Sequence, residues 1–374
     1  MRIGILCYPT FGGSGVVATE LGKALAGEGH SVHFITYSQP VRLEHFQENV
    51  FYHEVTVADY PLFEFAPYET ALTSKLVDVA KFEKLDLVHV HYAVPHASVA
   101  YMAKQILLDQ GIRLPFITTL HGTDITLVGR NASYSPVVTF GINQSDAVTS
   151  VSQSLRDETY RNFLITKEIH VIPNFIDLHR FNKMKKDHFR KAIAPNNERI
   201  LIHASNFRPV KRISDVLAVF EKIRSQLPCK LLLIGDGPER NRIEQECRES
   251  QCAEHIRFLG KLDAVEEVLS VGDLFLLPSE SESFGLAALE AMACQVPVIS
   301  SNTGGLPEVN VDGVTGFMSN VGDVDDMSQK ALRILKDEQT LSGFKKRALD
   351  QAKQFDIRHI LPMYSNLYEK VLKG

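Results

Sequence analysis

The stretch Asp273-Leu-Phe-Leu-Leu-Pro-Ser-Glu-Ser-Glu-Ser-Phe-Gly-Leu-Ala-Ala-Leu-Glu290 carries the most information about the fold. Its apolar run predicts a buried parallel strand over 273–277, and the polar turn after that strand leads into a helix. We place Ser283, Phe284 and Gly285 in the first turn of this helix. A helix N-terminus carries unpaired N–H groups and a partial positive charge, so the turn suits a phosphate. Gly285 would let a ligand approach the backbone closely.

Two carboxylates flank this turn. Glu282 stands at its mouth, and Glu290 follows eight positions later, roughly two helical turns along and on much the same face. The pair would line one side of a pocket whose floor binds phosphate. Without other evidence, the more common interpretation is structural: Glu282 would be an acidic residue at the start of the helix, and Glu290 a solvent-exposed helix residue.

Length and composition indicate a globular chain with more than one core. The 374 residues are too many for one ordinary hydrophobic core, so we expect two domains. Forty basic against 45 acidic residues, a net charge of -5, argue against nucleic acid as the main partner. Five cysteines without a CxxC pair indicate free thiols in a reducing cytoplasm and no metal site.

Targeting and membrane segments are not expected. The first predicted strand starts at Arg2, which leaves no room for a signal peptide. No apolar run approaches the roughly 18 residues needed to span a bilayer, so we expect no integral membrane association.

Strands alternate with helices through both halves of the chain, which predicts parallel, doubly wound sheets. The polar and basic segment 178–198 reads as a crossover between domains and a solvated face, and 357–372 as an amphipathic helix. The predicted strands lie at 3–8, 31–36, 85–91, 115–120, 146–151, 169–177, 199–205, 230–235, 256–260 and 273–277.

Several polar side chains follow strands of the first half, where open α/β sheets bind ligands. The loop 9–15 is rich in glycine, but it has neither GxGxxG spacing nor a P-loop lysine, so a plain tight turn is equally compatible with it. Tyr92 and His121 stand at strand ends. His89 and His91 lack a third ligand at metal-binding spacing, so packed histidines are the more common reading.

A basic loop follows the first strand of the second half. Arg208 and Lys211 would project at the carboxyl end of the strand, where a guanidinium fork and an ammonium can both meet phosphate. Loops of this kind are often only solvated. Gly235 reads as part of a turn after the next strand.

The segment from Glu282 to Glu290, with Val296-Pro-Val-Ile299 and Gly304-Gly-Leu-Pro-Glu308, resembles the donor-binding segment of retaining nucleotide-sugar glycosyltransferases of family 4. The resemblance extends over essentially the whole chain. It implies the GT-B architecture: an α/β fold of two Rossmann-like domains whose parallel sheets face each other across a cleft. We expect an N-terminal acceptor-side domain of 1–177 with the crossing helix 357–374, and a nucleotide-sugar-binding domain of 178–356. Ser283 and Gln295 depart from the family, which usually has glycine there; a left-handed Gln295 would cost about 1 kcal/mol.

The resemblance also implies roles for single residues. Glu282 would hold the transferred sugar, Glu290 the nucleotide ribose, and Arg208 and Lys211 would stabilise the departing diphosphate. As catalytic residues we expect His121, Arg208, Lys211 and Glu282; as donor-binding residues Gly13, Gly235, Ser283, Phe284, Gly285, Leu286 and Glu290; as acceptor-binding residues Ser14, Tyr92, Thr123, Asn206 and Arg208.

The segments 7–15, 91–97, 119–125 and 205–212 are similar to those of a family member that begins bacillithiol biosynthesis. That resemblance implies two small-molecule substrates: N-acetylglucosamine would pass from UDP-N-acetylglucosamine to the hydroxyl of L-malate. It implies no cofactor and no metal, because arginine, lysine and the helix dipole meet the leaving-group charge. Whether the chain forms a homo-oligomer stays open.

Three alternatives remain at this point. A lipid acceptor would call for a basic amphipathic membrane face, but the predicted helix 68–84 carries Asp78 and Glu83 beside its lysines. An enzyme like UDP-N-acetylglucosamine 2-epimerase would consume donor without any acceptor. A sugar-nucleotide-binding regulatory protein would bind UDP and turn nothing over.

Overall fold

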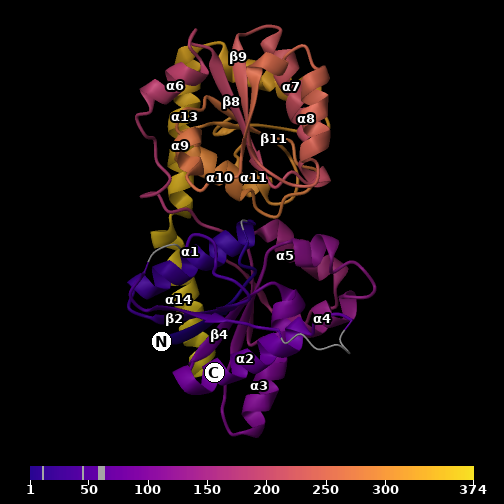
Figure 1. The fold of residues 1–374 in the computed structure, drawn as a ribbon, viewed down its shortest axis with the longest axis vertical. Helices are drawn as coiled ribbons and strands as arrows, with labels where there is room; N and C mark the ends of the chain where they lie inside the picture. The colour runs from indigo at the N-terminus through magenta and orange to yellow at the C-terminus, as the bar shows by residue number, and fades with distance from the viewer. Residues whose placement is uncertain (11, 44–45, 58–63) are drawn as a thin grey trace. The chain divides into compact units, whose positions relative to one another are not determined.

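The computed structural model describes residues 1–10, 12–43, 46–57 and 64–374 (Figure 1). Contacts within it divide the chain into two compact units. The first unit comprises Met1–Asn174 and Ile357–Gly374, and the second comprises Phe175–Asp356. The boundary expected from the sequence, after residue 177, lies slightly further along the chain.

The first unit contains a seven-stranded sheet in the order β3-β2-β1-β4-β5-β6-β7, parallel throughout. β4 and β5 are buried along their whole length, as expected of parallel strands covered on both faces. β3 was not predicted, because this edge strand is only partly buried and lacks a clear apolar pattern. The strands are β1 (Arg2–Leu6), β2 (Ser31–Thr36), β3 (Val50–Glu54), β4 (Leu87–His91), β5 (Phe116–Leu120), β6 (Ala147–Ser150) and β7 (Ile169–Val171).

Helices cover this sheet, and the C-terminal helix of the chain is one of them. In Figure 1, α14 runs beside α1, and it belongs to the first unit although it follows the whole of the second. The predicted amphipathic helix over 357–372 is thereby confirmed. The helices and helical turns are α1 (Gly13–Gly27), α2 (Tyr68–Glu83), η1 (Ala93–Ala97), α3 (Ser98–Asp109), η2 (Thr123–Leu127), α4 (Ser135–Gln144), α5 (Gln153–Asn162) and α14 (Ile357–Lys373).

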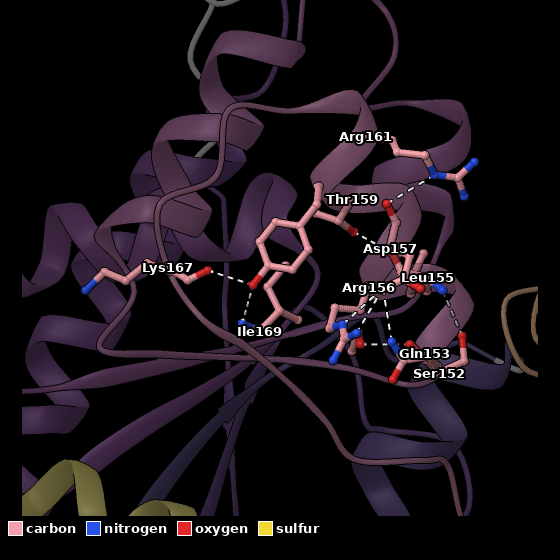
Figure 2. Close-up of polar contacts among 11 residues, drawn as sticks. Ser152, Gln153, Leu155, Arg156, Asp157, Thr159, Arg161, Lys167 and Ile169 are labelled. Atoms are coloured by element: carbon pink, nitrogen blue, oxygen red, sulfur yellow. Dashed lines mark hydrogen bonds and ion pairs between the residues drawn. The ribbon is translucent and has the colours of Figure 1, made fainter.

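Figure 2 shows how side chains hold the start and the end of α5. At the start, the backbone N–H of Leu155 donates to Oγ of Ser152 at 3.1 Å, which satisfies one of the unpaired donors of the first turn. At the end, the hydroxyl of Tyr160 donates to the carbonyl of Lys167 and accepts from the N–H of Ile169, at 3.0 and 2.8 Å. The helix is therefore tied directly to β7.

The second unit contains a six-stranded parallel sheet in the order β10-β9-β8-β11-β12-β13. Its strands are β8 (Arg199–Ser205), β9 (Cys229–Gly235), β10 (Ile256–Gly260), β11 (Leu274–Leu277), β12 (Val298–Ser301) and β13 (Gly316–Ser319). The strand order reverses between β8 and β11 here, and between β1 and β4 in the first unit. Ligands of open α/β sheets bind beyond the carboxyl ends of the strands at such reversals.

In Figure 1, α7 and α8 lie on one side of this second sheet and α9 and α13 on the other. The apolar faces of α7, α8 and α12 pack with β8 and β9 into one core cluster. The helices and helical turns are α6 (Asp187–Ile193), η3 (Pro209–Lys211), α7 (Ile213–Arg224), α8 (Arg240–Glu249), η4 (Ala253–His255), α9 (Val265–Leu269), α10 (Leu286–Ala293), α11 (Leu306–Val309), α12 (Val324–Leu335), α13 (Glu338–Ala352) and η5 (Lys353–Phe355).

The prediction that 178–198 is only a solvated crossover was wrong in part. The segment contains α6, and Arg190 on that helix donates to the buried carboxylate of Asp273 at 2.8 Å. Lys345 binds the other oxygen of the same carboxylate at 2.8 Å. Together the two cations hold the pKa of Asp273 below its usual value despite burial, so the segment is anchored at the start of β11. Across the described residues, the structure contains no helix both long and apolar enough to cross a membrane.

Candidate active site

In the second unit, an ion pair lies across the strand-order reversal. Lys211 closes the short helical turn η3 after β8, and Glu282 belongs to the loop after β11. The ammonium of Lys211 lies 2.5 Å from Oε2 of Glu282, and these side chains are only 18% and 17% exposed. The backbone N–H of Glu280 donates to the carbonyl of Val210 at 2.8 Å and joins the same two loops. The fold thus brings together two residues predicted to be catalytic.

The backbone at Glu282 is held by two glycines that follow β12. The N–H of Gly305 donates to the carbonyl of Glu282 at 2.9 Å. Gly304 has a φ of 56°, and a Cβ at this position would lie 2.0 Å from that same carbonyl oxygen. A larger residue at Gly304 would therefore displace the loop that carries Glu282.

The helix α10 begins later than the sequence predicted. Gly285 is its N-cap with a φ of 100°, so Ser283 and Phe284 precede the helix instead of forming its first turn. The argument that Glu282 and Glu290 lie two helical turns apart was therefore wrong, since only Glu290 is helical. The first-turn N–H groups from Leu286 onward remain suited to an anion.

The side chain of Phe284 packs inside the protein and does not face a ligand site. Its ring is buried in the second unit and packs edge-on against Phe355, with ring centroids 5.6 Å apart. The ring therefore anchors the loop before α10, and only the backbone of Phe284 is left for the predicted donor contact.

The remaining predicted residues of this unit also lie at strand ends. Asn206 and Arg208 follow β8 and are exposed. Gly235 ends β9 with a φ of 116°, and a Cβ there would lie 1.8 Å from the carbonyl oxygen of Ser205. The ends of β8 and β9 thus lie so close together that no residue larger than glycine would fit at position 235.

His203, which the sequence analysis did not single out, lies beneath this group of residues. Its Nδ1 bonds to the carbonyl of Leu276 on β11, and its Nε2 bonds to the hydroxyl of Ser205, both at 2.8 Å. Burial, with the nearby charge of Lys211, lowers the pKa of His203 to about 4. The ring is therefore neutral at pH 7 and links β8 to β11 at the reversal.

In the first unit, aromatic and histidine rings gather at the reversal between β1 and β4. Tyr8 follows β1 and Tyr92 follows β4, and their ring centroids lie 5.4 Å apart. The ring of Tyr92 lies 5.3 Å from that of His121, which follows β5. His91 Nδ1 and His121 Nε2 share a hydrogen bond of 2.8 Å. Burial lowers the pKa of His121 to about 3, so a neutral imidazole is presented here.

Asp124 organises the backbone around these rings, a role that the sequence analysis missed. Its carboxylate accepts from the N–H groups of Ala93 and Gly122, both at 2.9 Å, and from that of His121 at 3.3 Å. These bonds favour the charged form, but burial outweighs them and raises the pKa of Asp124 to about 6. An aspartate three residues after a strand-end histidine was the available signal.

The predicted loop before the first helix is shorter than expected. α1 begins at Gly13, so Gly13 and Ser14 belong to the first turn of the helix. Ser14 is buried and Gly13 is exposed. Thr123, which is partly buried, begins the turn η2. Phe11 of this loop lies outside the described residues.

Two family descriptions match the chain, Glycosyltransferase Family 4 over residues 11–180 and Glycosyl transferases group 1 over residues 184–351. The chain is 47% identical to the N-acetyl-alpha-D-glucosaminyl L-malate synthase of Bacillus anthracis, over 100% of this chain and 98% of that protein. The chain belongs to family 4 of the glycosyltransferases. This glycosyltransferase is also 25% identical to an uncharacterized glycosyltransferase of Methanocaldococcus jannaschii, over 97% of this chain and 96% of that one.

Solved structures share the fold of this glycosyltransferase. HepE of Anabaena, solved in complex with UDP and glucose, matches with a TM-score of 0.82 and 20% identity, over 99% of each chain. The sucrose-phosphate synthase of Thermosynechococcus elongatus matches with a TM-score of 0.80 and 22% identity, over 100% of this chain and 99% of that one. The predicted GT-B fold of two Rossmann-like domains is confirmed. The roles of the single site residues stay predictions.

Proposed function

We propose that this glycosyltransferase transfers N-acetylglucosamine from UDP-N-acetylglucosamine to the hydroxyl of L-malate, with retention at the anomeric carbon. The 47% identity to the synthase of Bacillus anthracis, over the full length of the chain, carries this proposal. The reaction would be the first step of bacillithiol biosynthesis. All five cysteines are free thiols, which suits a reducing compartment, so we assign the enzyme to the cytoplasm.

The second unit offers the groups that a nucleotide-sugar donor requires. Arg208, Lys211 and the N-terminus of α10 would meet the diphosphate, whose negative charge grows as the bond between the sugar and the phosphate breaks. Preorganised donors aimed at such charge contribute roughly 3–4 kcal/mol each to transition-state stabilisation. Glu282 would hold the sugar and Glu290 the ribose. The ion pair between Lys211 and Glu282 supports this assignment, because it places both side chains at the reversal.

The acceptor would contribute the oxygen atom of the new glycosidic bond. The hydroxyl oxygen of malate would attack the anomeric carbon on the face that the phosphate leaves, and the departing phosphate would take the hydroxyl proton. In the first unit, Ser14, Tyr92, Thr123 and His121 are donors of suitable type for a hydroxy dicarboxylate. Asn206 and Arg208 are such donors in the second unit. We propose no metal in this step, because Arg208 and Lys211 would meet the leaving-group charge.

The test measures UDP release by the purified protein from UDP-N-acetylglucosamine, with and without L-malate, in the presence and absence of EDTA. We expect release that depends on malate and is insensitive to EDTA, together with a glycosylated malate detected by mass spectrometry. Succinate is the matched control, because it has both carboxylates and no hydroxyl, so it should not accelerate release.

Other outcomes point to the alternatives. UDP release that needs no acceptor would favour an enzyme like UDP-N-acetylglucosamine 2-epimerase. UDP binding without turnover would favour a regulatory protein. Turnover only with a lipid or sugar acceptor would keep the donor assignment and overturn malate. Loss of activity in EDTA, restored by a divalent cation, would overturn the metal-free step.

A further inference from the structure

Three potential metal ligands meet at the β3 edge of the first sheet. His33 lies on β2, His53 on the edge strand β3, and Glu83 is the last residue of α2. One ligand atom of each residue lies within 4.8 Å of the other two. The registers of β2 and β3 put both imidazoles on the same face of the sheet, because His33 pairs with Phe51 and Ile35 with His53. None of the three is among the residues assigned to glycosyl transfer.

The separation of the two imidazoles is close to that of ligands on one ion. Nδ1 of His33 lies 3.0 Å from Nε2 of His53, where a single proton is shared. Two nitrogens bound to a tetrahedral Zn²⁺ at 2.0–2.1 Å lie about 3.3 Å apart. An ion would thus need only a small opening of the pair. The shared proton would move to the other nitrogen of its own ring, so that both facing nitrogens become available.

The charge and exposure of the cluster also suit a cation. The carboxylate of Glu83 supplies negative charge, and each imidazole can offer one nitrogen lone pair to an ion. His33 is only 2% exposed, whereas His53 and Glu83 are partly exposed and leave a path from solvent. Further charged groups lie nearby: Arg2 and Lys75 are cationic and Asp78 is anionic.

We propose that His33, His53 and Glu83 form a zinc site, with water as the fourth ligand, that fastens β3 to β2 and to the end of α2. Two imidazoles and one carboxylate are a donor set that Zn²⁺ accepts in proteins. The sequence predicted no metal site, because ligands 20 and 30 positions apart follow no recognised spacing. The site is independent of the proposed glycosyl transfer.

The test is a calorimetric titration of the full chain, first freed of metal with a chelator, with ZnCl₂. We expect one equivalent to bind, and Co²⁺ at the same site to give the strong visible absorption of tetrahedral coordination. His53→Ala and Glu83→Gln should each weaken binding by about 100-fold or more. His170→Ala is the matched control, since His170 also stands beside a glutamate, Glu168, at 3.7 Å, and this variant should bind zinc normally.

Thermal melting supplies a readout that does not depend on activity. Zinc should raise the melting temperature of the unmodified chain and of His170→Ala, and should leave that of Glu83→Gln unchanged. Absence of a one-equivalent binding event would overturn the proposal, as would an affinity that neither His53→Ala nor Glu83→Gln alters. Because none of these readouts uses substrate, they stand or fall separately from malate-dependent UDP release.

Discussion

The ammonium of Lys211 lies 2.5 Å from the carboxylate of Glu282, and this ion pair joins the loops that follow two adjacent strands, β8 and β11. The pair is mostly shielded from water, so its Coulomb attraction is screened less than that of a surface pair. Lys211 is thereby held in place by a contact within the second unit itself.

Replacement of Lys211 by alanine should lower turnover about a hundredfold or more, because the side chain that we propose as a donor to the leaving phosphate is lost. Lys222→Ala is the control: this lysine pairs with Asp325 at 2.8 Å on the exposed surface, and its loss should leave turnover unchanged. Rates of UDP release, compared at equal folded fraction by circular dichroism, check both. A folded Lys211→Ala protein with near-normal turnover would remove Lys211 from the mechanism.

Gly304→Ala should reduce turnover at least about tenfold, because a Cβ would lie 2.0 Å from the carbonyl oxygen of Glu282 and displace that loop. Gly313→Ala introduces comparable backbone strain, at a φ of 72°, but its nearest neighbour is a ring atom of Phe317 at 4.0 Å. That variant should lose about 1 kcal/mol of stability and keep its turnover. Equal kinetic losses in the two variants would contradict the positional role of Gly304.

Tyr368→Phe should destabilise the protein by about 1–2 kcal/mol, because the hydroxyl of Tyr368 shares a buried hydrogen bond of 2.7 Å with Nδ1 of His89. Tyr364 is the matched control, since it lies one turn earlier in α14 and is equally buried. Its hydroxyl lies near the side chains of Thr119 and Thr149, but among the described residues it makes no contact that meets hydrogen-bond geometry. Tyr364→Phe should therefore be close to neutral in urea denaturation. The reverse order of costs would refute this account of how α14 is attached.

The free energy of unfolding should fall as the pH drops below 6.5. Burial keeps His89, His91, His96 and His121 neutral in the folded state, with pKa values lowered to about 3 for His89 and His121 and about 4 for His96. Below pH 6.5 the unfolded chain binds protons at these histidines, whereas the folded chain does not. The stability that they contribute to the folded state is therefore fully present above pH 6.5 and is lost as the pH falls toward 4. Asp124 acts oppositely, because its raised pKa of about 6 favours folding as the pH falls through that value.

His33 and His203, whose pKa values burial lowers to about 4, act in the same direction as these four histidines. Together the histidines outweigh one carboxyl, so we expect a net loss on the order of several kcal/mol per pH unit in this window. Urea denaturation at a series of pH values between about 5 and 7 measures the slope. A flat or rising stability on acidification would show that these rings are not held neutral.

Gln295→Gly should stabilise the second unit by about 0.5–1 kcal/mol, because Gln295 has a φ of 63° at the end of α10, where glycine adopts this conformation without strain. The family resemblance predicted this left-handed position, and the structure confirms it. Gln295→Ala, which keeps the strain, should bring no gain. Thermal unfolding of the two variants side by side checks the difference; equal melting temperatures would mean that the strain at Gln295 is negligible.

Local patterns account for the parts of the fold that were predicted correctly. The apolar runs of β1, β9 and β11 are nearly continuous because parallel strands are buried on both faces, so they were visible without tertiary information. The edge strand β3 escaped prediction because it is only partly buried and lacks such a run, and β12 and β13, which were also not predicted, are only four residues long. The start of α10 was misplaced because the ring of Phe284 packs against Phe355, a tertiary contact that local capping preferences do not reveal.

Alternating apolar and amphipathic segments were enough to specify an α/β chain with polar residues at strand ends, since burial of apolar surface depends mainly on local periodicity. The strand order, and with it every long-range pair, could only come from the folded chain. Lys211 meets Glu282 because β8 and β11 are neighbours at a reversal. His33 meets His53 and Glu83 because β2 pairs with β3 next to the end of α2. Such contacts join residues far apart in sequence, and which of them form depends on how all the layers pack at once.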